Sequence, residues 1–364
     1  EALLTEDTNI ENTAIGHQAL KTQNGADGNT AVGFRAGLDL TTGGANTFVG
    51  AETAANVTTG ADNVMMGKAA GVNTQTASGS VLIGRSAGRD ISTGNENIAI
   101  GKEAMFDGTV TGDNNIAIGT NAADALTSGK NNVAIGKQAF TRAAAASEII
   151  AIGNNAAGQN TVTADADGAV AIGYFALGDL SSGADNTGIG YQAGTAITTG
   201  ARNTFLGYQA GTQSGATALT GNDNICIGFQ SGRLMEQGAS SNILIGSYAG
   251  DGQTVGGQMV FIGYEAGTST VTTDANGTVG IGYQTLASLT SGVGNTAVGY
   301  QAMTNAMDIG DFNTAIGYQA LIALDPGSDG HGSNTAVGYR AGYSCSTAEN
   351  NVFIGTSAGQ ATTG

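Results

Sequence analysis

The sequence is poor in the large side chains that fill a globular core. It has 364 residues but no Trp, 10 Phe, 10 Tyr and a single Pro, while Gly alone accounts for 61 positions. A globular chain of this length would form about two domains, each around its own thick apolar core. The 40% hydrophobic content is mostly Ala, Ile and Val, which suits a thin core. Disorder is also disfavoured, because disordered chains are rich in charge and Pro and poor in β-branched residues.

Basic residues are scarce as well. Lys and Arg number 12 against 29 Asp and Glu, for a formal charge of −17. Nucleic acid and anionic lipid both require a basic footprint, so neither is an expected partner. No apolar run approaches the roughly 18 residues of a membrane span. The chain opens at Glu1 with no signal segment, and we expect it to be a processed protein or a segment of a longer fibre.

One short motif recurs along the entire chain, as in NTAIGHQAL, NTAVGFRAG and NTFLGYQAG. A central glycine, here called the anchor, appears twenty times, and twelve of the nineteen spacings are 17 residues. Fixed periods of this length are typical of solenoids. The anchors are Gly16, Gly33, Gly50, Gly67, Gly84, Gly101, Gly119, Gly136, Gly153, Gly173, Gly190, Gly207, Gly228, Gly246, Gly263, Gly282, Gly299, Gly317, Gly338 and Gly355.

The three residues before each anchor predict a β-strand. Position −3 is always Thr, Val or Ile, and position −1 is Ile or Val except at Met66 and Leu206, and β-branched residues at a period of two favour strands. Position −2 is apolar too, so both faces of the strand are covered, whereas an isolated coil has one inside. We therefore expect position −2 to face partner chains, with Phe48, Phe205, Phe261 and Phe353 as the oligomer interface. The alternative is a monomeric solenoid whose outer face tolerates these residues.

The other repeat positions predict turns. Asn occupies position −4 in fifteen copies, and identical amides one coil apart can form a hydrogen-bonded ladder at a corner. The invariant anchor suggests a positive φ or a close backbone approach. A Ser/Thr-Gly pair precedes the Asn corner. We predict two short strands and two turns per coil, and coils stacked about 4.8 Å apart would give a rod of roughly 95 Å.

The N-[TVI]-A-[VI]-G-x-x-A pattern resembles the left-handed β-roll of YadA-like heads in trimeric autotransporter adhesins. The fuller form NTA[VI]GYQA[GL], at 295–303 and 313–321 and with Gly for Ala at 186–194, resembles repeats of bacteriophage tail fibres. The resemblance covers essentially the whole chain. It implies an all-β solenoid of about twenty coils, a parallel homotrimer, and an extracellular place on a cell or virion surface. The longer 17-residue coils and the absence of a stalk, anchor or chaperone domain leave adhesin and tail fibre both open.

Position +1 carries a row of aromatic residues in the second half of the chain. The tyrosines at this position are Tyr174, Tyr191, Tyr208, Tyr264, Tyr283, Tyr300, Tyr318 and Tyr339. Such a ladder offers a surface for sugar rings, since carbohydrate faces are apolar. The alternative is that identical rings one coil apart stabilise one another. In the first half the position is mixed and includes Lys68, Arg85, Lys102 and Lys137.

No residues suggest catalysis, a cofactor or a metal centre. The only histidines, His17 and His331, lie about eighteen coils apart, and no nucleophile motif or zinc spacing occurs. Three coils are enlarged, between residues 153–173, 207–228 and 317–338, and insertions in solenoids map to loops. The last holds Pro326 and His331 in DPGSDGHGSN, which we interpret as a solvated turn. Cys226 and Cys345 lie six to seven coils apart, roughly 30 Å, too far for a disulfide.

These observations predict a fibrous, extracellular, non-enzymatic protein that binds itself. The first hypothesis is a fibre shaft for adhesion or receptor binding, with a cell-surface glycan or protein as the receptor. The second is a structural filament subunit whose end coils stack between molecules. An ice-binding solenoid is disfavoured, because Val or Ile replaces Thr at position −3 in twelve of twenty copies.

Overall fold

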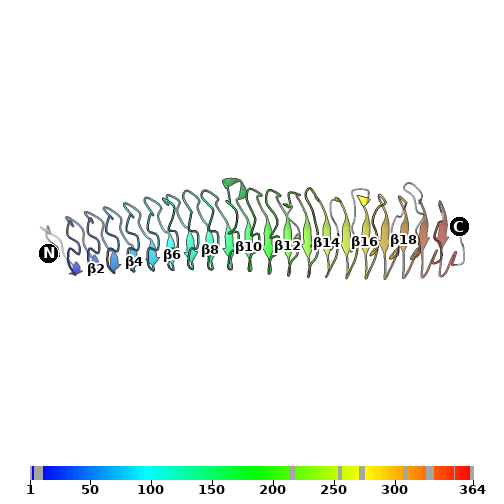
Figure 1. Cartoon of the computed structure of the whole chain (residues 1–364), viewed down its shortest axis with the longest axis horizontal. Helices are drawn as coiled ribbons and strands as arrows, with labels where there is room; N and C mark the ends of the chain where they lie inside the picture. Colours follow the sequence, from blue (N-terminus) through cyan, green and yellow to red (C-terminus); the bar gives the residue numbers. More distant parts are fainter. Residues whose placement is uncertain are drawn as a thin grey trace. The chain divides into compact units, whose positions relative to one another are not determined.

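The chain folds as an all-β parallel solenoid built from its 17-residue repeat. The structure is a computed structural model and describes residues 2–3, 11–212, 218–252, 256–269, 275–305, 310–324, 332–347 and 349–360. It divides into two compact units, unit 1 (Glu1–Ala184) and unit 2 (Asp185–Gly364), each described by itself. Each coil contributes one three-residue strand, and the strands of successive coils lie side by side within each unit (Figure 1).

Each unit contains ten parallel strands. In unit 1 the strands are β1 (Thr13–Ile15), β2 (Thr30–Val32), β3 (Thr47–Val49), β4 (Val64–Met66), β5 (Val81–Ile83), β6 (Ile98–Ile100), β7 (Ile116–Ile118), β8 (Val133–Ile135), β9 (Ile150–Ile152) and β10 (Val170–Ile172). In unit 2 they are β11 (Thr187–Ile189), β12 (Thr204–Leu206), β13 (Ile225–Ile227), β14 (Ile243–Ile245), β15 (Val260–Ile262), β16 (Val279–Ile281), β17 (Thr296–Val298), β18 (Thr314–Ile316), β19 (Thr335–Val337) and β20 (Val352–Ile354).

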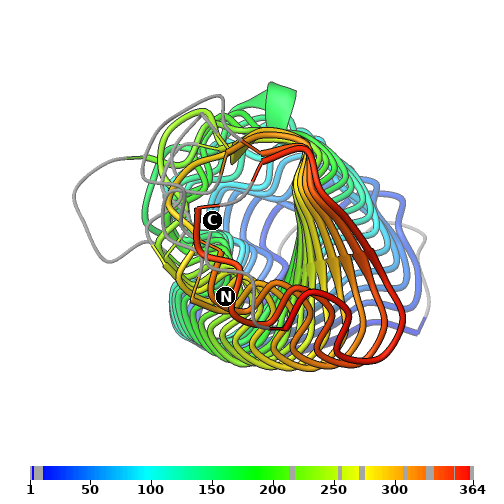
Figure 2. The ribbon, with the colours of Figure 1, turned by 90° about the vertical axis from the view of Figure 1, so that its right-hand side faces the viewer.

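Pairing between strands is in register throughout. In the first pair, Thr13, Ala14 and Ile15 lie opposite Thr30, Ala31 and Val32. The same offset of one coil relates later pairs, such as β11 and β12. Seen along the stack, successive coils of one unit trace nearly the same outline (Figure 2). Equivalent residues therefore form columns that run coil by coil along each unit.

The prediction of two strands per coil is wrong. Outside the named strands, isolated bridges join Ile91 with Val110, Ala143 with Val162, and Ile197 with Leu219. The other described residues lie mostly in turns and bends, and a 3₁₀ turn spans Ala164–Ala166 in an enlarged coil. The second run of apolar residues therefore fills the core without forming a regular sheet.

The anchor glycines meet both conditions predicted for them. Their φ lies between +116° and +145° in all twenty copies. A Cβ on Gly101 would lie 2.6 Å from the carbonyl oxygen of Gly119 in the next coil, and one on Gly207 would lie 2.5 Å from that of Gly228. Side chains avoid this conformation, and the neighbouring backbone leaves no room for one. The anchor thus sets how closely two coils approach.

The core lies inside each coil and is narrow. It consists of position −2, the Ala at +3, the residue at +4 and an apolar residue near +7 such as Leu40 or Ile91, all fully buried except in the end coils. Position +4 adopts left-handed φ in every coil. Where position −2 of its own or the next coil is Phe, Leu, Met or Cys, position +4 is mostly Gly. A Cβ on Gly250 would lie 2.6 Å from Leu244, and one on Gly232 would lie 2.7 Å from Cys226. The large side chain of this core therefore comes either from position −2, on one wall of the coil, or from position +4, on the opposite wall.

The Asn ladder predicted at position −4 is confirmed. Asn46 Nδ2 donates to Asn29 Oδ1 at 3.0 Å, and Asn63 Nδ2 donates to Asn46 Oδ1 at 3.1 Å. Each amide also donates to a backbone carbonyl, as Asn46 does to Gly60 at 2.9 Å. The left-handed residue of this corner is position −5, directly before the Asn, with φ from +56° to +78° in all twenty copies.

Candidate binding surfaces

Three outward surfaces, each made of two columns of side chains, are candidates for binding. They are the residues at −3 and −1, here called the outer strand face, the residues at +1 with their neighbours at +2, and the polar corner at −6 and −5. Each column repeats once per coil, so its members lie about 4.8 Å apart. A linear ligand or a parallel partner chain would match such columns.

The structure corrects the predicted orientation of the strand. Phe48, Phe205 and Phe261 at position −2 are fully buried inside the chain's own coil, so they are not an oligomer interface. Phe353, in the last coil, is half-buried at the same inward position. Alternation along a strand shows which residues share a face but does not show which face points inward. The reciprocal choice of Gly and bulky residues at −2 and +4 is the sequence signal that would have placed −2 inside.

The outer strand face is consequently apolar and exposed to varying degrees. Positions −3 and −1 carry Thr, Val and Ile, and the strands show a buried centre between half-buried or exposed flanks. Within the units, Met66 is 41% exposed, Leu206 42% and Ile316 41%. Long apolar surfaces on soluble proteins mark sites of association. Sequence reasoning found these columns but assigned them to the core.

The tyrosines predicted as a ladder do form one in unit 2. The rings of Tyr191 and Tyr208 lie 5.0 Å apart, and those of Tyr283 and Tyr300 also lie 5.0 Å apart, with interplanar angles of 7° and 4°. Phe229 continues the stack from Tyr208 at 5.2 Å. The stack changes to edge contacts at Tyr248, which lies at +2 in the coil whose +1 residue is Ser247. Tyr174 belongs to unit 1, where its ring contacts Phe175.

This stacking decides what the ladder can offer a ligand. Each inner ring has both faces covered by its neighbours, and the tyrosines are 40% to 46% exposed through their edges and hydroxyl groups. Sugar rings pack against aromatic faces, which are occupied here. A second ladder of glutamines at +2 lies beside the rings, with Gln301 Nε2 donating to Gln284 Oε1 at 2.9 Å. The geometry therefore favours mutual stabilisation of the rings over stacking of sugars.

In unit 1 the same +1 column is cationic over five coils. Lys68, Arg85, Lys102 and Lys137, here called the cation row, follow strands β4, β5, β6 and β8 and are exposed. Arg85 Nη2 lies 3.9 Å and Lys102 Nζ 3.4 Å from carboxylate oxygens of Glu103. Thr120 interrupts the row at β7.

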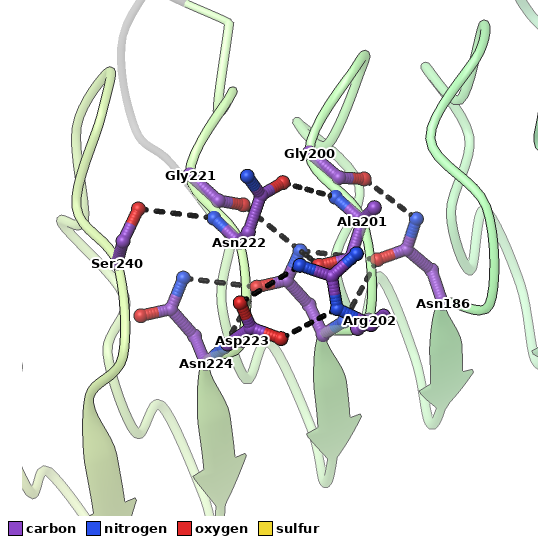
Figure 3. A network of polar contacts seen from close by, with 10 residues as sticks. Asn186, Gly200, Ala201, Arg202, Gly221, Asn222, Asp223, Asn224 and Ser240 are labelled. Carbon is purple, nitrogen blue, oxygen red and sulfur yellow. Dashed lines mark hydrogen bonds and ion pairs between the residues drawn. The ribbon is translucent and has the colours of Figure 1, made fainter.

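The polar corner supports the stack through a further ladder (Figure 3). Asn222 Oδ1 accepts from the backbone N–H of Ala201 at 2.7 Å, and Arg202 donates to both carboxylate oxygens of Asp223, at 2.7 and 2.9 Å. The Arg202 hydrogen bond lowers the pKa of Asp223. In unit 1, Asp113 accepts the backbone N–H of Asn95 at 2.9 Å, which lowers the pKa of Asp113. The hydrogen bonds of these side chains therefore link neighbouring coils to one another.

Two acidic residues in unit 1 are less favourably placed. Burial raises the pKa of Asp124, and repulsion from Asp107 adds to this. The Oδ1 atom of Asp124 is buried without a hydrogen-bond partner. Burial likewise raises the pKa of Asp179. In both residues partial burial of the carboxyl group disfavours its ionised form.

Cys226 and Cys345 are both buried and form no disulfide. Burial raises the pKa of the Cys226 thiol, and its sulfur lies 3.4 Å from that of Met235. The interior position makes Cys226 an apolar core residue.

The described part of the chain contains no group of three His, Cys, Asp or Glu side chains that could hold a metal ion. The predicted turn with Pro326 and His331 lies outside the described residues. None of the described segments forms a helix long and apolar enough to cross a membrane. No protein-family model matches the sequence, and no curated protein matches it either.

Proposed function

We propose that the chain is a shaft segment of an extracellular fibre that serves adhesion or receptor binding, and that it works as a parallel homotrimer. The observation that carries this proposal is the outer strand face. It repeats in every coil, it consists mainly of Ile and Val with Thr at some −3 positions, and it lies outside the coil's own core. A solenoid unit whose apolar face repeats in every coil is suited to association along that face.

The area of this face suits stable association. Ten strands 4.8 Å apart, each three residues of about 3.3 Å, present about 480 Å² per unit. Over both units of two copies, about 1,900 Å² would be buried, which is the size of a standard specific interface. The number three and the extracellular place come from the resemblance to adhesin and tail-fibre repeats.

Light scattering of the purified chain tests the proposal. We expect a discrete trimer in the native protein, and we expect Ile100→Lys combined with Ile118→Lys to shift it to monomer. Thr111→Lys is the matched control, since Thr111 is exposed in the same part of unit 1 but lies away from the strand. A native monomer would refute the trimer, and open-ended polymers would support the filament hypothesis instead.

A further inference from the structure

The +1 column carries no acidic residue in any of the twenty coils. This is unexpected in a chain with 29 Asp and Glu but only 12 Lys and Arg. Four of the 12 basic residues fall in this column, within five consecutive coils of unit 1. At 4.8 Å per coil, the cation row from Lys68 to Lys137 extends over about 19 Å.

The row is poorly neutralised by its surroundings. The Arg85 side chain is 66% exposed and that of Lys102 is 52% exposed, and they share a single carboxylate, Glu103, whose own side chain is 19% exposed. The ammonium groups of Lys68 and Lys137 make no ion pair with described residues. Other cations of unit 1 are better matched, since Arg89 pairs with Asp90 and Lys130 with Asp113.

Like charges at equivalent positions of neighbouring coils repel, so the row does not stabilise the solenoid. It is, however, the arrangement that a linear polyanion would neutralise. Successive charges lie one coil apart on one line, and the long side chains can adjust to a ligand's spacing. The strand stack holds their backbones in place, which lowers the entropy cost of ordering the site.

We propose that the cation row binds a linear acidic polysaccharide, which lies along unit 1 with its carboxylate or sulfate groups on Lys68, Arg85, Lys102 and Lys137. This inference deepens the proposed function, because it names the class of receptor for a surface-binding shaft. Nucleic acid is the weaker candidate. It requires a broad basic footprint, whereas this row is a single file on an acidic chain.

Affinity electrophoresis with fluorescently labelled probes tests the proposal on the full chain. The probes are heparin for sulfate, polygalacturonate for carboxylate, dextran as a neutral polysaccharide, and single-stranded DNA. We expect one or both acidic polysaccharides to bind, dextran not to bind, and binding to weaken as salt rises above about 0.15 M, where charges are screened within about 8 Å.

The decisive comparison uses two fourfold variants of equal charge. Lys68→Gln, Arg85→Gln, Lys102→Gln and Lys137→Gln together should weaken polysaccharide binding by about tenfold or more, since four exposed charge contacts are lost. The control replaces Lys21, Arg89, Lys130 and Arg142 of the same unit by Gln, and it should retain most of the binding.

Four results would overturn the proposal: no binding of either acidic polysaccharide, an equal loss in the control variant, DNA binding as tight as polysaccharide binding, or a changed oligomeric mass in the cation-row variant. The last result would assign the row to a contact between copies. Binding by a native protein that proves monomeric would refute the trimer and leave this inference standing.

Discussion

Two stretches of the array, β6–β10 in unit 1 and β11–β15 in unit 2, contain the same coil but fill its core from opposite walls. In coils β6 to β10 of unit 1, position −2 is always Ala, and the bulk comes from +4, with Met105, Phe140 and Leu177. In coils β11 to β15 of unit 2, position +4 is always Gly, and the bulk comes mostly from −2, as in Phe205 and Phe261. Because protein interiors are close-packed, only the summed volume is constrained. The repeat thus specifies a volume shared by two positions.

Their surfaces differ at the same column. In unit 1 the +1 column holds the exposed cation row, and in unit 2 it holds stacked aromatic rings beside a glutamine ladder. The coil backbone does not require either chemistry, since both follow the same anchor with the same φ. Position +1 is therefore where coils of the same architecture can differ in the surface they offer a ligand. Positions −2 and +4 are where they can differ in core side chains without changing that surface.

The largest effect should come from the anchor glycines, and it should be equal in the two units. Gly119→Ala and Gly207→Ala would each place a Cβ 2.5 Å from the carbonyl oxygen of the next anchor, at φ of +137° and +134°. We expect each to lower the free energy of unfolding by about 4 kcal/mol or more, measured by urea denaturation.

Two other glycines provide matched controls for these substitutions. Gly25 in unit 1 and Gly238 in unit 2 also have positive φ, but a Cβ on either would meet no atom within 4 Å. Their replacement by Ala should cost only about 1 kcal/mol. Anchor variants that prove no worse than these two would contradict the close-approach explanation.

The next largest effect tests whether the two walls are exchangeable. Phe205→Ala should cost about 3–5 kcal/mol through the cavity it leaves, and Gly211→Leu should be destabilising because a Cβ there overlaps the Phe205 ring. The double variant recreates the arrangement of Ala171 with Leu177 in unit 1. We expect it to be at least about 1 kcal/mol more stable than additivity allows. Additive losses in denaturation would show that the walls are not interchangeable.

A smaller effect should distinguish the two +1 chemistries. Tyr283→Ala removes stacking contacts of 5.3 and 5.0 Å with Tyr264 and Tyr300, and we expect a loss of about 1–2 kcal/mol. Lys102→Ala in unit 1 should change the free energy of unfolding by less than about 0.5 kcal/mol, because the side chain is exposed. Tyr283→Phe keeps the ring and should remain near native stability. If Tyr283→Ala behaves like Tyr283→Phe, the stack does not stabilise unit 2.

The smallest effect depends on pH and has opposite sign in the two units. Because burial raises the pKa of Asp124, its ionised form is destabilising, and that cost disappears as pH falls through the raised value. Asp124→Asn should therefore raise the melting temperature by about 1–2 °C at pH 7 and by less near pH 4. Asp223, whose pKa is lowered by Arg202, stabilises above its ordinary pKa, so Asp223→Asn should lower the melting temperature slightly at pH 7. Thermal melts at both pH values check this pair.

The period of the array and the corners of the coil could be predicted from the sequence because each depends on local chemistry. The invariant anchor indicated its backbone conformation, and the recurring Asn indicated the amide ladder. Which face of the strand points inward could not be predicted from alternation, because positions −3, −2 and −1 all carry apolar or β-branched residues. The second predicted strand was wrong since residues near +7, such as Leu126, fill the core from a turn. Trimer, receptor and location stay predictions.

Because the amide ladder is in register, the smallest insertion or deletion that preserves its hydrogen bonds is one whole coil. An amide such as Asn115 meets Asn97 on one side and Asn132 on the other, and a coil inserted between them would present the same groups to both neighbours. A gene could lengthen or shorten such an array by one coil without redesigning any contact. Length is then set by copy number, and the spacing between what lies at its two ends can change in steps of about 4.8 Å.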